Sequence, residues 1–126
     1  MKKQIIHTIS APAAIGPYSQ AVRVGDTIYL SGQTPLDPLT MELVGGGIKA
    51  QARQVFENLN AVAKAAESEL SHAVKLTIYL TDLNNFQSVN KVMSDYFEEP
   101  YPARVTVGVA SLPKAASVEI DAILVV

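Results

Sequence analysis

The alternation of apolar and polar residues along the chain predicts six strands and two helices. In residues 74–80 the apolar side chains of Val74, Leu76, Ile78 and Leu80 alternate with polar ones, the pattern of a strand with one buried face. Residues 48–67 instead place apolar side chains three and four positions apart, which predicts an amphipathic helix. A second helix is predicted from Phe86 to Pro100, after turn and capping residues at 81–84. The other predicted strands are a short edge strand at 5–6 and strands at 21–24, 27–31, 103–109 and 117–125.

The order of these elements, β-β-β-α-β-α-β-β, indicates an α+β fold. In such a fold both helices can cover one face of a single mixed sheet. The two residues Gly25-Asp26 between the second and third strands suit a type II′ hairpin turn. The chain has 126 residues without a repeat or a linker, so we expect residues 1–126 to form one domain around one core.

The same alternation assigns the polar residues of the last two strands to a face. In the strand at 103–109 three valines share one side, which leaves Arg104 and Thr106 on the other, and in the last strand Glu119 lies opposite the apolar side. If the helices cover the apolar sides, Arg104, Thr106, Glu119, Lys75 and Tyr79 lie on the uncovered face of the sheet. That face must contact either water or a neighbouring molecule. Alternation leaves open whether the strands of Arg104 and Glu119 are adjacent.

Composition and charge exclude several classes of function. The chain has no cysteine, which excludes disulfides, thiolate nucleophiles and cysteine-ligated metal. His7 and His72 are far apart and no acidic cluster accompanies them, so we expect no metal. With 10 Lys+Arg against 12 Asp+Glu the net charge is −2, which gives no basic surface for nucleic acid. No apolar stretch is long enough to cross a bilayer, and we therefore expect a soluble, cytoplasmic protein without membrane contact.

Arg104 and Glu119 carry the candidate chemistry. A guanidinium can clamp a small carboxylate through two parallel N–H···O bonds, and Tyr101-Pro102-Ala103 gives Arg104 a rigid entry into its strand. Glu119 stands among apolar residues, where partial burial can raise the pKa of a carboxyl and suit it to act as a general base or acid. An ion pair that merely joins strands is an equally good interpretation of Glu119 from its position alone.

A set of short motifs occurs in a fixed order along nearly the whole chain. Each motif is common by itself, but their joint order and spacing strongly resemble the Rid/YjgF family of reactive-intermediate (enamine/imine) deaminases. The motifs are Gly16-Pro17-Tyr18-Ser19-Gln20-Ala21, Ser31-Gly32-Gln33, Glu57-Asn58-Leu59, Thr81-Asp82-Leu83 with Phe86 and Val89-Asn90, Pro102-Ala103-Arg104, Leu112-Pro113 and Val118-Glu119-Ile120.

The resemblance implies a chorismate-mutase-like fold and a homotrimer with ligand clefts between subunits, in which a neighbour covers the open sheet face. It implies that Arg104 binds the substrate carboxylate, that Glu119 orients or activates water, and that Tyr18 is a further catalytic candidate. Thr106 stands where many members have a cysteine. The other residues that match cleft positions are Ser31, Gly32 and Asn90.

The activity that the resemblance implies is hydrolytic deamination of reactive 2-imino acids to 2-keto acids and ammonia, without a cofactor. These imines arise from 2-aminoacrylate or 2-aminocrotonate, and their removal protects pyridoxal-phosphate enzymes. The alternative is a protein that binds keto acids or other small carboxylates without turnover, as a regulator, a translation inhibitor or a chaperone-like protein. The first helix lacks the glycine with which it usually ends in the family and has Glu67 there, so we expect its end to differ.

Overall fold

The computed structural model describes residues 2–126 as a six-stranded sheet with two helices. The strands lie in the order β1-β2-β3-β6-β4-β5, and only the pair β4 and β5 is parallel. Three single turns of 3₁₀ helix occur in the connections. The elements are β1 (Gln4–Ile6), β2 (Ala21–Val24), β3 (Thr27–Gln33), α1 (Gly47–Ala65), β4 (Ala73–Leu80), α2 (Phe86–Met93), β5 (Ala103–Gly108) and β6 (Val118–Val125).

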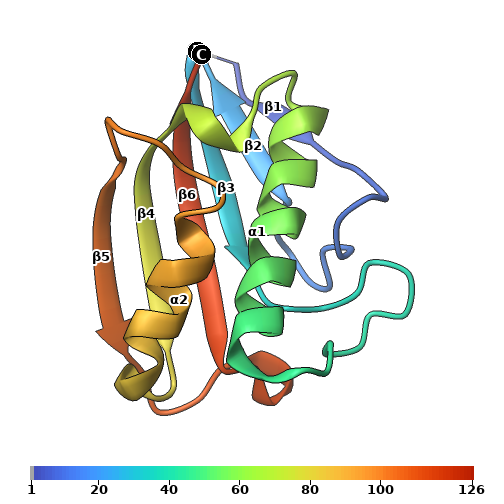
Figure 1. Cartoon of the computed structure of the whole chain (residues 1–126). Helices are drawn as coiled ribbons and strands as arrows, with labels where there is room; N and C mark the ends of the chain where they lie inside the picture. The colour runs from blue at the N-terminus through green and yellow to red at the C-terminus, as the bar shows by residue number, and fades with distance from the viewer. Residues whose placement is uncertain (1) are drawn as a thin grey trace.

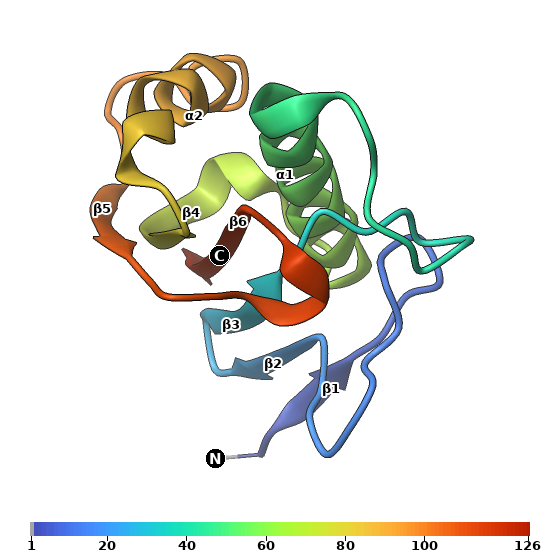
Figure 2. The ribbon, with the colours of Figure 1, turned by 90° about the horizontal axis from the view of Figure 1, so that it is seen from below.

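Both helices lie on the same face of the sheet, which leaves the opposite face uncovered within the chain (Figures 1 and 2). The core lies between these two layers. It is built from one side of each central strand, such as Leu76, Ile78 and Leu80 of β4, packed against the apolar side of α1, including Phe56 and Leu59. The predicted fold, with two helices on one face of a mixed sheet in the order β-β-β-α-β-α-β-β, is therefore confirmed.

The hairpin between β2 and β3 follows its sequence. Val24 pairs with Thr27, so the connection has the two predicted residues, and Gly25 has a φ of 59°. A positive φ at the first turn position is what a type II′ turn requires, and glycine adopts it without steric cost.

Two details of the predicted elements are wrong. The second helix ends at Met93 and not at Pro100. Phe97 is buried all the same, because the chain that follows α2 packs back onto α1, with the Phe97 ring 6.0 Å from that of Phe56. Val74 is exposed although alternation assigned it to the buried face, because the register with β6 shifts between Ala73 and Lys75 and Ala73 takes the buried place. A bulge of this kind cannot be read from alternation.

The orientation of β5 is also opposite to the prediction. Arg104 and Thr106 pair with Leu76 and Ile78 of β4, whose side chains are buried under the helices. Val105 and Val107 therefore lie on the uncovered face, where they are 43% and 38% exposed. Alternation separates the polar and apolar residues of β5 correctly. The apolar side of this strand faces away from the helices because β5 is an edge strand beside the short helix α2.

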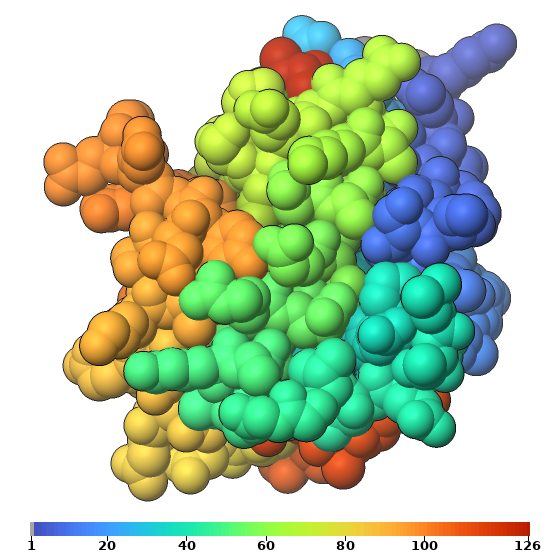
Figure 3. Space-filling model, turned by 45° about the vertical axis from the view of Figure 1, so that its right-hand side comes forward, coloured from blue at the N-terminus to red at the C-terminus, as the bar shows by residue number. Residues whose placement is uncertain are grey.

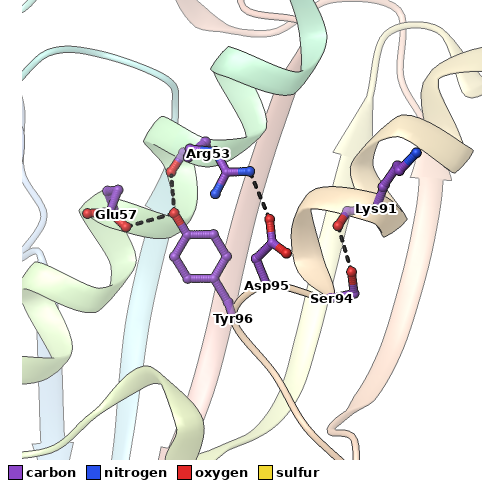
Figure 4. A network of polar contacts seen from close by, with 6 residues as sticks. All are labelled: Arg53, Glu57, Lys91, Ser94, Asp95 and Tyr96. Carbon is purple, nitrogen blue, oxygen red and sulfur yellow. Dashed lines mark hydrogen bonds and ion pairs between the residues drawn. The ribbon is translucent and has the colours of Figure 1, made fainter.

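A polar network fixes the segment that follows α2 against α1 (Figure 4). Arg53 forms an ion pair with Asp95 at 2.9 Å, and the hydroxyl of Tyr96 donates a hydrogen bond to Glu57 at 2.7 Å. The ring of Tyr96 stacks on Phe56 with 5.0 Å between centroids. These contacts hold the end of α2, and with it the side chains that α2 presents to β5.

Helix α1 ends without a glycine, as the sequence indicated. Glu67 adopts a φ of 59°, and the amide of Ser68 donates to the carbonyl of Ala63 while that of Glu67 donates to Lys64. This is the hydrogen-bonding pattern of a Schellman motif, in which the left-handed position is usually a glycine. The helix therefore ends in this motif with a strained glutamate at the position that glycine usually takes.

Candidate functional site

Arg104 is held by three residues of the second helix. Its Nη1 donates a hydrogen bond to Oδ1 of Asn90, its guanidinium lies 5.0 Å from the ring centroid of Phe86, and the sulfur of Met93 is 3.7 Å from Nη1. A cation over an aromatic face and an amide acceptor both restrict the rotamers of a long side chain. Helix α2 therefore positions Arg104, the residue predicted to bind the substrate carboxylate.

A hollow of about 480 Å³ opens beside the Arg104 guanidinium. One wall is the end of α2, with Asn90, Met93 and Ser94, and the other is Tyr101-Pro102 in the link to β5. This link, in orange, projects from the body of the molecule (Figure 3). Arg104 itself is exposed, so its free N–H groups can reach an anion in the hollow.

Thr106 lies two residues after Arg104, on the same side of β5. Its Oγ1 is buried and is the one buried side-chain oxygen or nitrogen in residues 2–126 without a hydrogen-bond partner. It borders a shallow hollow with Leu83 and Phe86. A buried hydroxyl without a partner costs stability, and such groups in native proteins call for an explanation.

Glu119 lies on the uncovered face of the sheet, over the backbone of Gly32 in β3. A Cβ added to Gly32 would be 2.2 Å from Oε2 of Glu119, so only glycine leaves room for this carboxylate. The register between β3 and β6 shifts between Leu30 and Gln33, which is where Gly32 lies. A glycine in a strand often marks such a bulge or the close approach of another group.

Tyr18 and Ser31 border the same hollow as Gly32 and Glu119. The hydroxyl of Ser31 donates to the carbonyl of Ser19 at 2.6 Å, and the Tyr18 hydroxyl accepts a hydrogen bond from the amide of Ile15 at 3.3 Å. The Tyr18 side chain is 52% exposed, so its hydroxyl hydrogen remains available to a bound molecule.

The predicted site residues thus form two groups that the sheet separates. Arg104, Asn90 and Thr106 lie on the helix side of the edge strand β5, whereas Tyr18, Ser31, Gly32 and Glu119 surround a hollow that includes the uncovered side of β6. The strands of Arg104 and Glu119 are not adjacent, because β4 lies between them. The expectation that both residues share the uncovered face is wrong, and a single chain cannot bring them to one small ligand.

The carboxyl of Glu119 has a raised pKa, as its apolar surroundings predicted. Burial is the larger cause and the negative charge of Asp121 the smaller one. The phenol of Tyr79 donates a hydrogen bond to Asp121 at 3.0 Å, and this bond is the main cause of the raised pKa of Tyr79. No ion pair joins Glu119 to a neighbouring strand in residues 2–126.

Sequence reasoning missed two contributions to the site. Phe86 and Met93 of α2 both contact Arg104, and Asp121 accepts the hydrogen bond of Tyr79 beside Glu119. The spacing of Phe86, Asn90 and Met93 on one side of a helix was the available signal for the first pair.

Two further expectations concern metals and membranes. In the part of the chain that the structure describes, residues 2–126, no cluster of three or more His, Asp or Glu side chains could hold a metal ion. Within the same residues, neither helix has the length and apolar character that a membrane crossing requires.

Comparison with known proteins gives matches over nearly the full length of the chain. The sequence profile of the family described as Endoribonuclease L-PSP matches residues 8–126. A 2-iminobutanoate/2-iminopropanoate deaminase from Dermatophagoides farinae is 50% identical over 124 residues, which cover 98% of this chain and 97% of the relative.

Solved structures show the same likeness. RidA from the Antarctic bacterium Psychrobacter sp. PAMC 21119 superposes with a TM-score of 0.94 at 54% identity, covering 98% of this chain and 99% of the other. Escherichia coli TdcF, in a crystal structure with bound serine, superposes with a TM-score of 0.92 at 42% identity, covering 98% of both chains. Each match therefore includes both groups of candidate site residues.

Proposed function

The chain belongs to the Endoribonuclease L-PSP family, which is the Rid/YjgF family that its motifs resemble, and from this premise we propose how its residues hydrolyse 2-imino acids. The reaction is the deamination of 2-iminobutanoate and 2-iminopropanoate to the 2-keto acids and ammonia, the activity for which relatives at about half identity are named. The observation that carries the proposal is the guanidinium of Arg104, exposed in a hollow and fixed by Asn90 and Phe86.

In this proposal Arg104 binds the carboxylate of the imino acid through its free N–H groups. A planar fork of donors matches a planar carboxylate, and a rigidly held fork loses little freedom on binding. The bound serine of TdcF supports a small amino-acid-like ligand for the family. Thr106 lies two residues after Arg104 on the same side of β5, and in this proposal a ligand oxygen satisfies its hydroxyl, which is buried without a partner in the described chain, once the contacts that cover it open.

Glu119 and Tyr18 act on the water and on the nitrogen. Glu119 in its ionised form accepts a proton from the water that attacks the C=N carbon, and Tyr18 orients that water or the nitrogen. The carbon–nitrogen bond of the tetrahedral intermediate then breaks and ammonia leaves. Positioning and charge stabilisation provide most of the acceleration, which suits a reaction that also proceeds in free water.

The two groups of site residues meet between subunits of a homotrimer in this proposal. The uncovered sheet face is apolar enough to need a neighbour, since Ile5, Tyr29, Val105 and Val107 are 54%, 50%, 43% and 38% exposed there. Exposed apolar surface of this kind marks interaction sites. A second copy that covers this face can bring the Glu119 group of one subunit to the Arg104 group of the next. The proposed location of the protein is the cytoplasm, where dehydratases release the substrate.

The test of the carboxylate site replaces Arg104 by lysine. Keto-acid formation is followed with a threonine dehydratase that generates 2-aminocrotonate in the assay. We expect KM to rise about 10- to 100-fold, because a point charge replaces a bidentate clamp worth about 1.5–3 kcal/mol. Arg53→Lys is the matched control, since Arg53 also forms a charged contact on the helix side but lies outside the site. Equal KM values for the Arg104 variant and the wild type contradict the assignment.

The test that separates an enzyme from a non-catalytic sensor replaces Glu119 by glutamine. An enzyme loses turnover by about 100-fold or more and still binds a 2-keto acid, which isothermal calorimetry measures. Glu42→Gln serves as the control because Glu42 is exposed on the loop before α1. Wild-type protein that binds keto acids but does not accelerate imine hydrolysis supports the sensor instead.

A further inference from the structure

Two carboxylates lie on the same side of β6, and only one of them has a hydrogen-bond donor. Glu119 and Asp121 are two residues apart, which places both side chains on the uncovered face, with their Cα atoms about 7 Å apart along the strand. Tyr79 of β4 pairs directly with Glu119 in the sheet register, yet its hydroxyl donates to Oδ2 of Asp121 at 3.0 Å. The phenol of the residue that pairs with Glu119 in the register therefore binds the other acid.

The Glu119 side chain leans in the opposite direction, over Gly32 of β3. Within residues 2–126, no hydrogen bond contributes to the pKa of the Glu119 carboxyl. Burial and the charge of Asp121 are the two causes that raise this pKa. Gly32 and Tyr79 together keep the two acids apart: the missing side chain at 32 leaves room for one, and the phenol holds the other.

We propose that Asp121, held in place by Tyr79, is a positioning residue that keeps a fixed negative charge beside Glu119 so that Glu119 carries its proton through the catalytic cycle. The inference rests on the proposed function, because it concerns the acid–base residue of that reaction. Asp121 does not contact the substrate in this proposal. It acts on Glu119 through its charge, and Tyr79 acts on Asp121 through the hydrogen bond.

The reaction requires Glu119 in two protonation states. When water adds to the protonated C=N carbon, the new C–O bond forms and one water proton passes to the Glu119 carboxylate. The same proton then passes to the amino nitrogen, and the C–N bond breaks as the C=O bond forms. The hydroxyl proton of the intermediate passes to the departing ammonia, so ammonium and the keto acid leave with Glu119 ionised again. A carboxyl that holds the proton between these steps needs a pKa nearer to the working pH than that of a solvated glutamate.

Within residues 2–126, the other charged groups that border the same hollow as Glu119 do not offset this arrangement. Lys114 borders the same hollow, but its Nζ donates a hydrogen bond to the carbonyl of Met41 at 2.7 Å, which directs the ammonium toward the loop that precedes α1. The remaining titratable groups on this face or at this hollow are Tyr18 from the N-terminal loop, Tyr29 from β3, and Lys75 and Tyr79 from β4.

The test is Asp121→Asn, which removes the charge and keeps an oxygen that can accept the Tyr79 hydrogen bond. The rate of imine hydrolysis is measured against pH, with the uncatalysed rate subtracted at each point. We expect the acidic limb of the kcat/KM profile to move to lower pH by about half a pH unit to one pH unit, the size of one charge at about 7 Å with partial screening. Asp26→Asn is the matched control, because it removes the same charge at the exposed β2–β3 turn.

Tyr79→Phe tests the second part of the proposal. The charge of Asp121 remains in this variant, but the Tyr79 hydroxyl no longer holds it in place. The acidic limb of the kcat/KM profile should therefore move in the same direction by a smaller amount. An unchanged limb in Asp121→Asn overturns the role of Asp121, and an unchanged limb in Tyr79→Phe alone overturns the role of Tyr79. Carbon-13 NMR titration of the Glu119 carboxyl, assigned through Glu119→Gln, reports the same shift without any turnover. It therefore tests Asp121 even if wild-type protein shows no deaminase activity, the result that contradicts the proposed function.

Discussion

Gly32→Ala is the most direct test of where the Glu119 carboxylate must lie. The added Cβ falls 2.2 Å from Oε2, 3.0 Å from Cδ and 3.2 Å from Cγ of Glu119. Ordinary contact begins at 3.4 Å, so the oxygen must move by about 1.2 Å, and the whole end of the side chain has to rotate with it. The backbone of Gly32 has no positive φ, which means that alanine is tolerated there without strain.

The expected magnitude follows from this displacement. A catalytic group moved by about 1 Å costs about 100-fold in rate, so we expect kcat/KM for imine hydrolysis to fall by that factor. The fold should not be weakened, because the atoms that must move are the far end of a flexible side chain and because alanine restricts the unfolded chain. We expect the free energy of unfolding to stay within about 1 kcal/mol of the wild type.

The assay couples the protein to a threonine dehydratase and follows 2-ketobutyrate formation, with urea unfolding measured on the same preparation. Gly45→Ala is the matched control, since a Cβ there meets nothing within 4 Å. A double-mutant cycle with Glu119→Ala shows whether the loss acts through the carboxylate. The cost of Gly32→Ala should then nearly vanish in the Glu119→Ala background.

Activity of Gly32→Ala within threefold of the wild type refutes the reasoning, because it means that the observed position of Glu119 does not matter for the reaction. A full 100-fold loss that persists in the Glu119→Ala background refutes it as well, since the methyl group then blocks the ligand directly.

Two predictions concern stability. Glu67→Gly should raise the free energy of unfolding by about 1 kcal/mol and the Tm by about 3–5 °C, because Glu67 occupies a left-handed position that costs an L-residue about 1–2 kcal/mol. Thermal unfolding measures both quantities. Glu69→Gly is the control and should destabilise the protein, because Glu69 has a φ of −142°. Tyr96 has its pKa raised from 10.0 to about 12, chiefly by burial and then by its hydrogen bond to Glu57, so the folded state favours the neutral phenol. The stability that the neutral phenol contributes is present below pH 10 and is lost as the pH rises through 12. The free energy of unfolding, measured with urea, should therefore fall less steeply with pH in Tyr96→Phe than in the wild type over this window.

The fold could be predicted from the sequence because its elements have strong local signals. The helix at 47–65 and the strand at 73–80 each bury one side, and their periods differ enough to be told apart. The end of α2 could not be predicted in the same way, because Phe97 continues the apolar spacing while the chain there has already turned back onto α1. The bulge at Val74 is invisible for a related reason, since one extra residue changes the face without changing the composition.

The candidate site residues could be named from the sequence, but their arrangement could not be predicted from it. Alternation places Arg104 opposite the valines of its strand, and that relation holds in the structure. It contains no information on which of the two sides the helices cover, and for β5 the helices cover the arginine side. The short helix α2 decides this, because Phe86, Asn90 and Met93 offer an aromatic face, an amide oxygen and a thioether to Arg104 and not an apolar layer to the valines.

This reversal turns an error of orientation into the main argument for assembly. With Arg104 and Glu119 on one face, a single subunit would contain the site and the exposed valines would need a separate explanation. With Arg104 on the helix side and Glu119 on the other, the proposed reaction requires a second copy to complete the site, and Val105 and Val107 form part of the exposed apolar surface that this copy would cover. In the proposed trimer one partner copy accounts for both observations, because the copy that covers the valines would also bring the second half of the site to the edge strand. In that proposal a small chain of 126 residues builds its substrate pocket at the boundary with a second copy.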